Sequence, residues 1–599
     1  MNPMEAYRMI CGKQKWVTPA CVLGCLLLAC IALGASFHPA YSAHLAHSAL
    51  VARTVAQSIP LSQSHQSPET PEAAEDSKIL YTLYMPYFPN QYAPMPTATP
   101  RPTVTPPILS GTPSAQPTLQ DPQVNPTVTS LAPTSPAPGL PTPTAMPTVT
   151  PGGPTLTPGP TTQPTPPTPG GPTATPEPYF GFGVEAFDLQ SYSQQIYSLG
   201  ARWTRQNALH WSVIEPSPGE RNWQQVTTLE NRLIKSSAEK LETILIIRLT
   251  PAWAQMVPGS VCGPVRSDKF ADFGRFIYDV VARYSQPPYN VTYFEIGNEV
   301  DALTNNAPDE FYGCWADAGD SLYRGGGYYA SMLKVVYPML KAANPKAQLL
   351  LGGFLADCDP LHPPTPTADC SYTSFFEGIL KDGGANYFDG VSFHSYDYYL
   401  ETPGHWGNYG WSSAHNKIGS ALIPKARYYK HMLAAYGVTG KYLLDTEAAL
   451  ICTACTPAMQ HETAKAWYVP EVFAAGMAEG LKAVLWYSHE GWRGSELRAP
   501  DGSLLPAAAA LRIAHAKFGG ATYLGPILPT DVGNVGVVGY KFKQGNRTLW
   551  LVRAFDAVER PIELTTLPTS VSDPLGNTIA PSKTLMLTLM PVYIEWGSQ

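Results

Sequence analysis

The stretch YFEIGNEVD, residues 293–301, is an apolar strand pattern that ends abruptly in the polar pair Asn298 and Glu299. A carboxylate is costly inside a protein core, but it is useful at the carboxyl end of a barrel strand, where active sites form. A second stretch, KYLLDTE at residues 441–447, follows the same pattern and ends in Glu447. These two glutamates are therefore the candidate reactive pair of the chain.

Short apolar segments alternate with amphipathic segments between residues 179 and 520. The predicted strands are residues 180–184, 201–205, 243–249, 292–296, 348–351, 390–393, 442–445 and 483–486. Helical patterns between them cover residues 270–284, 328–343, 374–382, 424–436 and 462–479. Eight strands that alternate with helices predict an α/β fold, the (β/α)8 or TIM barrel. A doubly wound open sheet is the alternative, although no glycine-rich phosphate-binding fingerprint follows the first strand.

Three further regions flank the predicted barrel. Residues 521–599 switch to short alternating strands, which predicts a small C-terminal β-sandwich. Residues 94–178 are dominated by Pro, Thr, Gly and Ser and contain no aromatic residue, so we expect a disordered, extended linker. Residues 44–93 show no clear domain pattern.

The N-terminus carries a targeting segment, residues 1–43. Basic residues precede an apolar run at residues 17–35, and small residues follow it, as in a secretory signal peptide. The run is also close to the ~20 residues that span a bilayer, so an uncleaved membrane anchor is the alternative. The segment predicts a secreted or cell-surface protein, attached to a membrane or cell wall if the anchor is retained.

Composition limits the partners of this 599-residue chain. A formal net charge of −7 and the lack of a basic stripe argue against a nucleic-acid partner, and we expect a monomer. Six of the ten cysteines lie outside the targeting segment, an even number that predicts disulfides in an exported protein. The pairs we expect are Cys262 with Cys314, Cys358 with Cys370, and Cys452 with Cys455.

Glu299 and Glu447 would end the fourth and seventh barrel strands, so both side chains would face one mouth. Two carboxyl groups on either side of a bond are the arrangement of glycoside hydrolysis, in which one donates a proton and the other attacks or activates water. Two solvated loop acids are the alternative interpretation. Strand alternation also directs Glu295 into the barrel, toward an arginine such as Arg248, and gives Asp445 the same face as Glu447 as a fallback nucleophile.

The residues around both glutamates resemble the clan A glycoside hydrolases, whose signature is Asn-Glu after strand four and a glutamate ending strand seven. The resemblance covers residues 179–520 and includes Arg205, WSVIEP at 211–216, HSY at 394–396 and WYSH at 486–489. It implies a retaining O-glycosidase acting on a carbohydrate, with Glu299 as the acid/base and Glu447 as the nucleophile. We expect no metal and no other cofactor.

The resemblance also implies substrate-binding residues. Asn298 would bind the sugar 2-hydroxyl, Arg205 and Tyr396 would hold Glu447, His394 would line the pocket, and Trp486 would form a stacking floor. The chain departs from the commonest clan pattern because Val300 follows Glu299 where proline is frequent. The family within the clan, and with it the substrate, is left unresolved.

Two other functions compete with this interpretation. Residues 319–322, GDSL, match the nucleophile string of an esterase family, and Asp359 and His362 would supply its other members. That chemistry needs its serine directly after the first strand, whereas these residues lie in mid-domain. A non-catalytic carbohydrate-binding barrel on a tether is the second alternative, although binding alone does not need two acids facing one bond.

Overall fold

The computed structural model describes residues 180–302, 313–316, 323–411, 420–452, 455 and 458–597. The predicted targeting segment (1–43), the segment 44–93, the linker 94–178 and the GDSL stretch 319–322 lie outside the described residues. Among the helices that are described, none is both long enough and apolar enough to cross a membrane.

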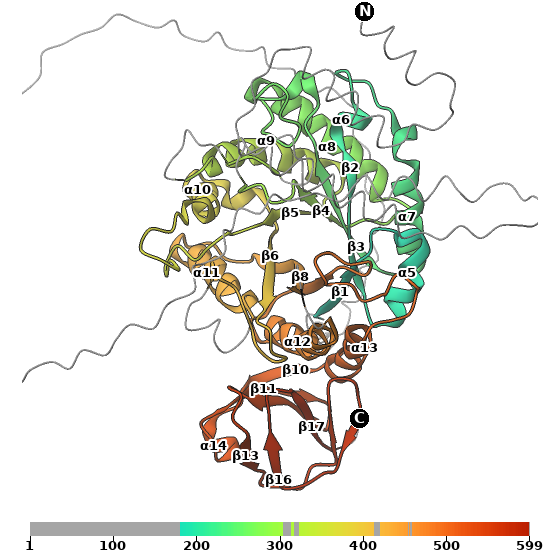
Figure 1. The fold of residues 1–599 in the computed structure, drawn as a ribbon. Helices are drawn as coiled ribbons and strands as arrows, with labels where there is room; N and C mark the ends of the chain where they lie inside the picture. The colour runs from blue at the N-terminus through green and yellow to red at the C-terminus, as the bar shows by residue number, and fades with distance from the viewer. Residues whose placement is uncertain are drawn as a thin grey trace, which may run out of the picture. The chain divides into compact units, whose positions relative to one another are not determined.

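Eight parallel strands close into a barrel (Figure 1). They are β1 (Gly181–Glu185), β2 (Trp203–His210), β3 (Glu242–Arg248), β4 (Tyr293–Ile296), β5 (Gln348–Phe354), β6 (Gly390–Tyr399), β8 (Tyr442–Ile451) and β9 (Ala483–Tyr487). Each pairs with the next, and β9 pairs with β1 to complete the ring. A short strand, β7 (Trp406–Gly407), runs antiparallel to β6. The TIM-barrel prediction is confirmed, and all eight predicted strands coincide with barrel strands.

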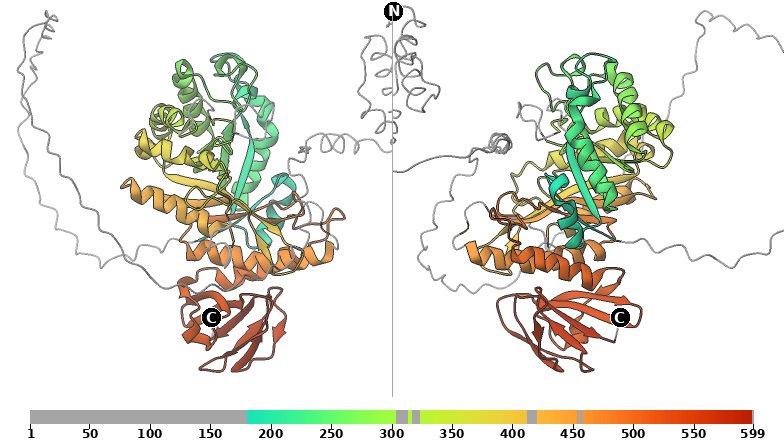
Figure 2. Two further views of the ribbon diagram at one scale, coloured as in Figure 1. Left: turned by 60° about the vertical axis from the view of Figure 1, so that its left-hand side comes forward. Right: turned by 90° about the vertical axis from the view of Figure 1, so that its right-hand side faces the viewer.

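Amphipathic helices surround the barrel (Figures 1 and 2). They are α5 (Leu189–Ser198), α6 (Trp211–Ile214), α7 (Thr227–Ala238), α8 (Phe270–Tyr284), α9 (Gly326–Ala343), α10 (Phe375–Lys381), α11 (Leu422–Ala435), α12 (Ala458–Ala478) and α13 (Pro506–Phe518). In α8, the buried residues Phe273, Phe276, Ile277 and Val280 recur at helical spacing and form one apolar face. β3 carries an almost continuous apolar run because parallel strands are buried on both faces.

The barrel interior changes from apolar to charged along its axis. Its amino-terminal end is filled by one cluster of side chains: Trp203, Ile244, Tyr293, Leu350, Leu444, Ala483 and Leu485. Two residues further along their strands, Arg205 and Glu295 point to the same interior because side chains alternate along a strand. The apolar layer therefore forms the floor on which a charged layer lies.

Strand irregularities occur next to this charged layer. The register between β6 and β8 shifts, so that Phe393 pairs with Asp445 but His394 pairs with Glu447. Thr446 is the extra residue of this β-bulge. Bulges redirect the side chains that follow them, and they are frequent beside active sites.

The C-terminal region folds into two sheets. Strands β10 (Thr522–Pro526), β11 (Val537–Gln544), β12 (Arg547–Ala554), β14 (Ser570–Ser572), β15 (Thr578–Ile579) and β17 (Val592–Trp596) form one sheet, and β13 (Arg560–Glu563) pairs with β16 (Thr584–Leu587). A short helix, α14 (Pro529–Val532), follows β10. Buried residues of both sheets, such as Ile562, Leu587 and Val552, form one apolar cluster, as expected for a small sandwich. The outer face of the larger sheet packs on the barrel, where Phe518 of α13 contacts Phe542 at 4.8 Å between ring centroids.

All three predicted disulfides are present. They join Cys262 to Cys314, Cys358 to Cys370 and Cys452 to Cys455. The first links the loop after β3 to the loop after β4, and both loops lie at the carboxyl end of the barrel. The cysteines therefore fasten the loops that border the mouth.

Candidate active site

Glu299 lies just beyond the end of β4, where the backbone leaves the extended conformation. Gly297 has φ +86° and Glu299 has φ +51°, both in the left-handed region. A Cβ atom on Gly297 would collide with the Val300 side chain, so glycine is required at this turn. The backbone N–H of Glu299 donates to the Gly353 carbonyl at 3.0 Å. Because the strand has ended, Asn298 and Glu299 both reach the mouth instead of pointing to opposite faces.

Arg205 is the centre of the charged layer and is completely buried. Its Nη2 atom donates to Glu295 Oε1 and to Asn298 Oδ1, each at 2.6 Å. Its Nη1 atom donates to Glu447 Oε1 and lies 3.4 Å from Glu185 Oε2. Glu295 points into the barrel as predicted, but its partner is Arg205 instead of the expected Arg248. One guanidinium thus fixes three carboxylates and the Asn298 amide.

Glu447 receives two hydrogen bonds, one on each carboxylate oxygen. Arg205 donates to Oε1, and the Tyr396 hydroxyl donates to Oε2. Charge-assisted hydrogen bonds of this kind are strong and directional, so they fix the orientation of the carboxylate. The structure therefore brings Arg205 and Tyr396 to Glu447, where the resemblance placed them.

His394 lies between the two glutamates. Its Nδ1 atom is 2.9 Å from Glu299 Oε1, and its Nε2 atom is 3.5 Å from Glu447 Oε1. One oxygen of Glu299 and one of Glu447 lie within 4.8 Å of each other. The two carboxyl groups therefore lie close together, and the imidazole of His394 contacts both of them.

The two glutamates have different electrostatic surroundings. Burial raises the pKa of Glu299 well above its ordinary value, and the negative charge of Glu447 raises it further. Burial lowers the pKa of His394 well below its ordinary value, and Arg205 adds to this effect, so both favour the neutral imidazole. Burial and the charge of Glu447 raise the pKa of Tyr396, whose hydroxyl therefore stays a donor. Glu299 is set up to hold a proton, whereas Glu447 is held by two donors.

Asp445 does not share the face of Glu447. The interior position of Leu444 turns Asp445 outward, where it accepts a hydrogen bond from Ser395, and the bulge at Thr446 brings Glu447 back to the interior. We predicted that the side chains of Asp445 and Glu447 lie on the same face of the strand. This prediction was wrong because strict alternation does not hold across a bulge. Asp445 therefore lies outside the reactive cluster.

Trp486 is the predicted site residue that the structure does not bring to the mouth. It is fully buried, its indole N–H donates to the Ser495 carbonyl at 2.8 Å, and its ring faces Tyr468 of α12. The neighbouring Leu485 points into the barrel, so alternation turns Trp486 outward. This burial leaves no open ring face for stacking, and the stacking-floor prediction for Trp486 does not fit its position.

Tyr487 and Trp492 are the aromatic residues that the sequence interpretation missed. Tyr487 pairs in register with Glu185 on the interior face, and both rings lie beside Tyr396, Trp492 at 5.2 Å and Tyr487 at 6.2 Å between centroids. Glu185 itself was missed, although it directly follows a predicted strand in the same way as Glu447. The rule that selected the two glutamates would also have selected Glu185.

Comparisons with known proteins give a fold match without a sequence match. No family profile matches the chain, and no curated protein sequence matches it. A family 39 glycoside hydrolase from the gut symbiont Bacteroides cellulosilyticus WH2 superimposes with a TM-score of 0.53 and 18% identity, over 69% of this chain and 80% of that one. The chain is similar in fold to the clan A glycoside hydrolases. A GH30 endoxylanase from Clostridium papyrosolvens C71 gives a TM-score of 0.47 and 14% identity, over 70% and 97% of the two chains.

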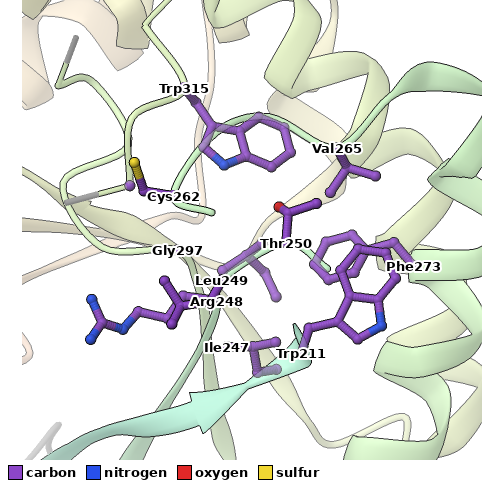
Figure 3. Close-up of a pocket in the computed structure, with 12 residues that line it drawn as sticks. Trp211, Ile247, Arg248, Leu249, Thr250, Cys262, Val265, Phe273, Gly297 and Trp315 are labelled. Atoms are coloured by element: carbon purple, nitrogen blue, oxygen red, sulfur yellow. The ribbon is translucent and has the colours of Figure 1, made fainter. Parts of the chain in front are cut away.

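A small cavity lies beside the mouth of the barrel. Its volume is about 20 Å³, and its lining includes Trp211, Thr250 and Trp315, as Figure 3 shows. This volume holds about one water molecule. The Thr250 hydroxyl already donates to the Gly263 carbonyl at 2.9 Å. The cavity is too small for a sugar. It lies between the loop after β3 and helix α8.

Glu299, His394 and Glu447 form the set of residues that could ligate a metal ion among the residues that the structure describes. The guanidinium of Arg205 already bonds Glu447, and its positive charge would oppose a cation at this place. The absence of a metal and of a cofactor stays a prediction.

The residues of the esterase alternative do not form a triad with described partners. Asp359 Oδ2 lies 3.1 Å from His362 Nδ1, but the His362 side chain is 66% exposed. The serine of that motif lies outside the described residues.

Proposed function

We propose that this protein is an exported, retaining glycoside hydrolase that cleaves O-glycosidic bonds of a poly- or oligosaccharide. The observation that carries the proposal is that carboxylate oxygens of Glu299 and Glu447 lie within 4.8 Å of each other. The surroundings of Glu299 favour its protonated form, whereas Glu447 accepts hydrogen bonds from Arg205 and Tyr396. Retaining enzymes have carboxyl groups ~5–5.5 Å apart, whereas inverting enzymes need ~6.5–9.5 Å to admit a water molecule.

In the first step, Glu299 donates its proton to the glycosidic oxygen while a Glu447 oxygen attacks the anomeric carbon. The bond to the leaving group breaks, and a glycosyl ester forms on Glu447. Arg205 and Tyr396 hold the attacking carboxylate in place and stabilise the charge that it loses and regains. Asn298, fixed by Arg205, would bind the 2-hydroxyl of the same sugar.

In the second step, Glu299 is ionised and takes a proton from water, which attacks the anomeric carbon and releases Glu447. The same residue then holds the proton needed for the next cycle. Neutral His394 lies against Glu299 and orients its carboxyl group in both steps.

Export is part of the proposal. Three disulfides support an oxidising compartment, and the N-terminal sequence supports a secreted or cell-surface location. Attachment through an uncleaved N-terminal segment, a monomeric state and the absence of a nucleic-acid partner remain predictions.

A panel of aryl glycosides and polysaccharides tests the activity, with Glu299→Gln and Glu447→Gln as site variants. Glu242, at the amino end of β3 and so at the opposite end of the barrel, supplies the matched control Glu242→Gln. We expect no measurable turnover for Glu447→Gln, a loss of about 10²–10⁴-fold for Glu299→Gln on substrates with poor leaving groups, and normal rates for the control. Normal turnover by Glu447→Gln would refute the nucleophile.

The stereochemistry of the first product separates the mechanisms. Proton NMR of the released sugar should show the anomeric configuration of the substrate, because two displacements restore it. Inversion would remove the nucleophile role from Glu447. Binding of glycan without turnover, unchanged in both variants, would instead support a carbohydrate-binding barrel.

A further inference from the structure

Strands β6 and β8 continue past the two proposed catalytic glutamates and form a wall at one side of the mouth. Their pairing runs without interruption from His394, opposite Glu447, to Tyr398, opposite Ile451. On its other edge, the end of β6 pairs with the short antiparallel strand β7. We call this three-stranded extension the β6 wall. It extends the mouth beyond the reactive pair.

Alternation along β6 directs Tyr396 and Tyr398 to the same face of the β6 wall. The Tyr396 hydroxyl donates to Glu447, so this face is the one that borders the mouth. Asp397, between the two tyrosines, points the other way and accepts a hydrogen bond from Tyr468 of α12 at 2.7 Å. Two residues along a strand advance by about 6.6 Å. Tyr398 therefore lies one step farther from Glu447 than Tyr396 does, on the same face.

Tyr409, in the loop after β7, continues this aromatic face outward. The rings of Tyr398 and Tyr409 lie 5.7 Å apart between centroids and are tilted by 41°. Tyr409 is 71% exposed, and Tyr398 is partly exposed. Aromatic rings that lie open at the edge of an active-site mouth supply contact area for a ligand. The two tyrosines therefore prolong the mouth with a surface that a substrate can reach.

The loop that carries Tyr409 is fastened on both sides of this residue. Asn408 donates through its amide to the Tyr396 carbonyl at 2.7 Å. Trp411 donates through its indole N–H to the Ala356 carbonyl, in the loop after β5, at 2.6 Å. A side chain whose backbone is held before binding loses less freedom when a ligand contacts it. The exposed ring of Tyr409 is therefore carried by an ordered loop.

The place of the β6 wall in the barrel decides which part of a substrate it meets. In the proposed reaction, Glu447 bonds to the sugar on the glycone side, whereas Glu299 protonates the leaving group. The wall is built on β6 and on β8, the strand of Glu447. Glu299 follows β4, and β5 lies between β4 and β6. The tyrosines of the wall therefore lie on the glycone side of the reactive pair.

From this continuity, we propose that Tyr398 and Tyr409 form a distal sugar subsite on the glycone side. A tyrosine ring offers a flat apolar face to the C–H groups of a sugar and a hydroxyl at its edge to the sugar's polar groups. The enzyme then acts on a chain that is held over several glycone units, and not on a single terminal sugar. This inference rests on the proposed glycosidase function and adds the class of substrate to it.

Substrates with one leaving group and a growing glycone test the subsite in the full-length protein. The probes are 4-nitrophenyl glycosides of xylose, glucose, mannose and galactose, each with one, two and three sugar units, and kcat/KM is measured from nitrophenol release. For the sugar that the enzyme accepts, we expect kcat/KM to rise about tenfold or more from one unit to three. Turnover that does not increase with length would overturn the subsite and leave the proposed glycosidase standing. Absence of turnover on every probe would overturn both.

Variants of Tyr409 make the test specific to the β6 wall. Tyr409→Ala should lower the ratio of kcat/KM for three units to kcat/KM for one unit about fivefold, because one aromatic contact with the distal sugar is lost. Tyr409→Phe keeps the ring and should keep most of this ratio. Tyr278→Ala, at a tyrosine of α8 that is 39% exposed, is the matched control and should leave the ratio unchanged. An unchanged ratio in Tyr409→Ala, or an equal loss on short and long substrates, would refute the subsite.

Discussion

Arg205 lies 2.6 Å from Glu295, a buried acid on a strand two positions away in the barrel. The same guanidinium donates to Glu447 and Asn298, so a structural ion pair and the reactive group share one cation. The floor of the mouth and the proposed nucleophile are therefore fixed by a single side chain.

Replacement of Arg205 should damage both the fold and the activity. Arg205→Met leaves buried carboxylates without their partner, and we expect the free energy of unfolding to fall by about 3–5 kcal/mol. Arg205→Lys keeps the charge but cannot donate through two nitrogen atoms at once to Glu447 and Asn298. We therefore expect kcat to fall about 10²-fold or more. Urea denaturation and steady-state kinetics measure the two effects. Arg275→Ala, at a side chain that is 60% exposed, is the control and should change neither.

Glu185 should make stability depend on pH. Burial raises its pKa from an ordinary value of 4.5 to about 8, and Arg205 only partly opposes the increase. Between these pH values the folded chain keeps a proton that the unfolded chain releases, so the free energy of unfolding falls as pH rises. Glu185→Gln removes this dependence and should flatten the slope of stability against pH over that window. Glu220→Gln, at an exposed position, should leave the slope unchanged.

Activity should be lost at high pH through Glu299. Its carboxyl must be protonated in the first step, and burial with the charge of Glu447 raises its pKa. The value of kcat/KM should therefore fall as pH rises through the pKa of Glu299. An activated aryl glycoside, whose leaving group needs little protonation, should show a weaker fall. Equal pH profiles for activated and unactivated substrates would contradict the assignment.

Trp486 and Trp492 should respond differently to substitution. Trp486→Ala empties a buried site and should cost about 3–5 kcal/mol of stability, whereas Trp486→Phe should retain KM. Trp492 is only partly buried beside Tyr396, and Trp492→Ala should raise KM about tenfold, a loss of about 1.4 kcal/mol of binding. Thermal unfolding and Michaelis–Menten kinetics separate the two. A large rise of KM in Trp486→Phe would restore the original stacking prediction.

Removal of the Cys262–Cys314 disulfide should loosen the mouth. The bridge closes a separation of 52 residues, for which chain entropy gives about 4 kcal/mol of stabilisation. The double variant Cys262→Ser/Cys314→Ser should lose about this amount, and it should become sensitive to proteolysis between β3 and α9. Cys358→Ser/Cys370→Ser, which opens a separation of 12 residues, should lose less. Equal losses would show that strain or packing, and not loop closure, dominates.

The barrel was predictable because its strands are apolar runs separated by helices of clear periodicity. The end of β4 was also predictable, because polar residues interrupt its apolar run at Asn298. The expectation that Glu447 ends its strand was wrong, because β8 continues past it to Ile451. Arg205, His394 and Tyr396 followed from a resemblance, and the structure brings them to the two glutamates. Their roles in the reaction remain to be tested.

The directions of side chains beyond irregular backbone were not predictable from the sequence. Asp445 was given the wrong face because the bulge at Thr446 depends on pairing with β6, which is a tertiary property. Trp486 was expected in the mouth, although the residue that faces the interior is Tyr487, one position later. The partner of Glu295 was also missed, because tertiary packing decides which arginine of the barrel reaches it, and that arginine is Arg205.

The packing of Phe518 against Phe542 has a consequence for how this protein can change over evolution. Phe518, Leu549, Leu551 and Tyr593 belong to the same continuous core as the barrel, so the end of α13 is not a boundary between independent modules. Recombination that swapped the C-terminal strands alone would expose apolar surface on both parts. The C-terminal strands can be inherited or exchanged only together with the helix that they cover.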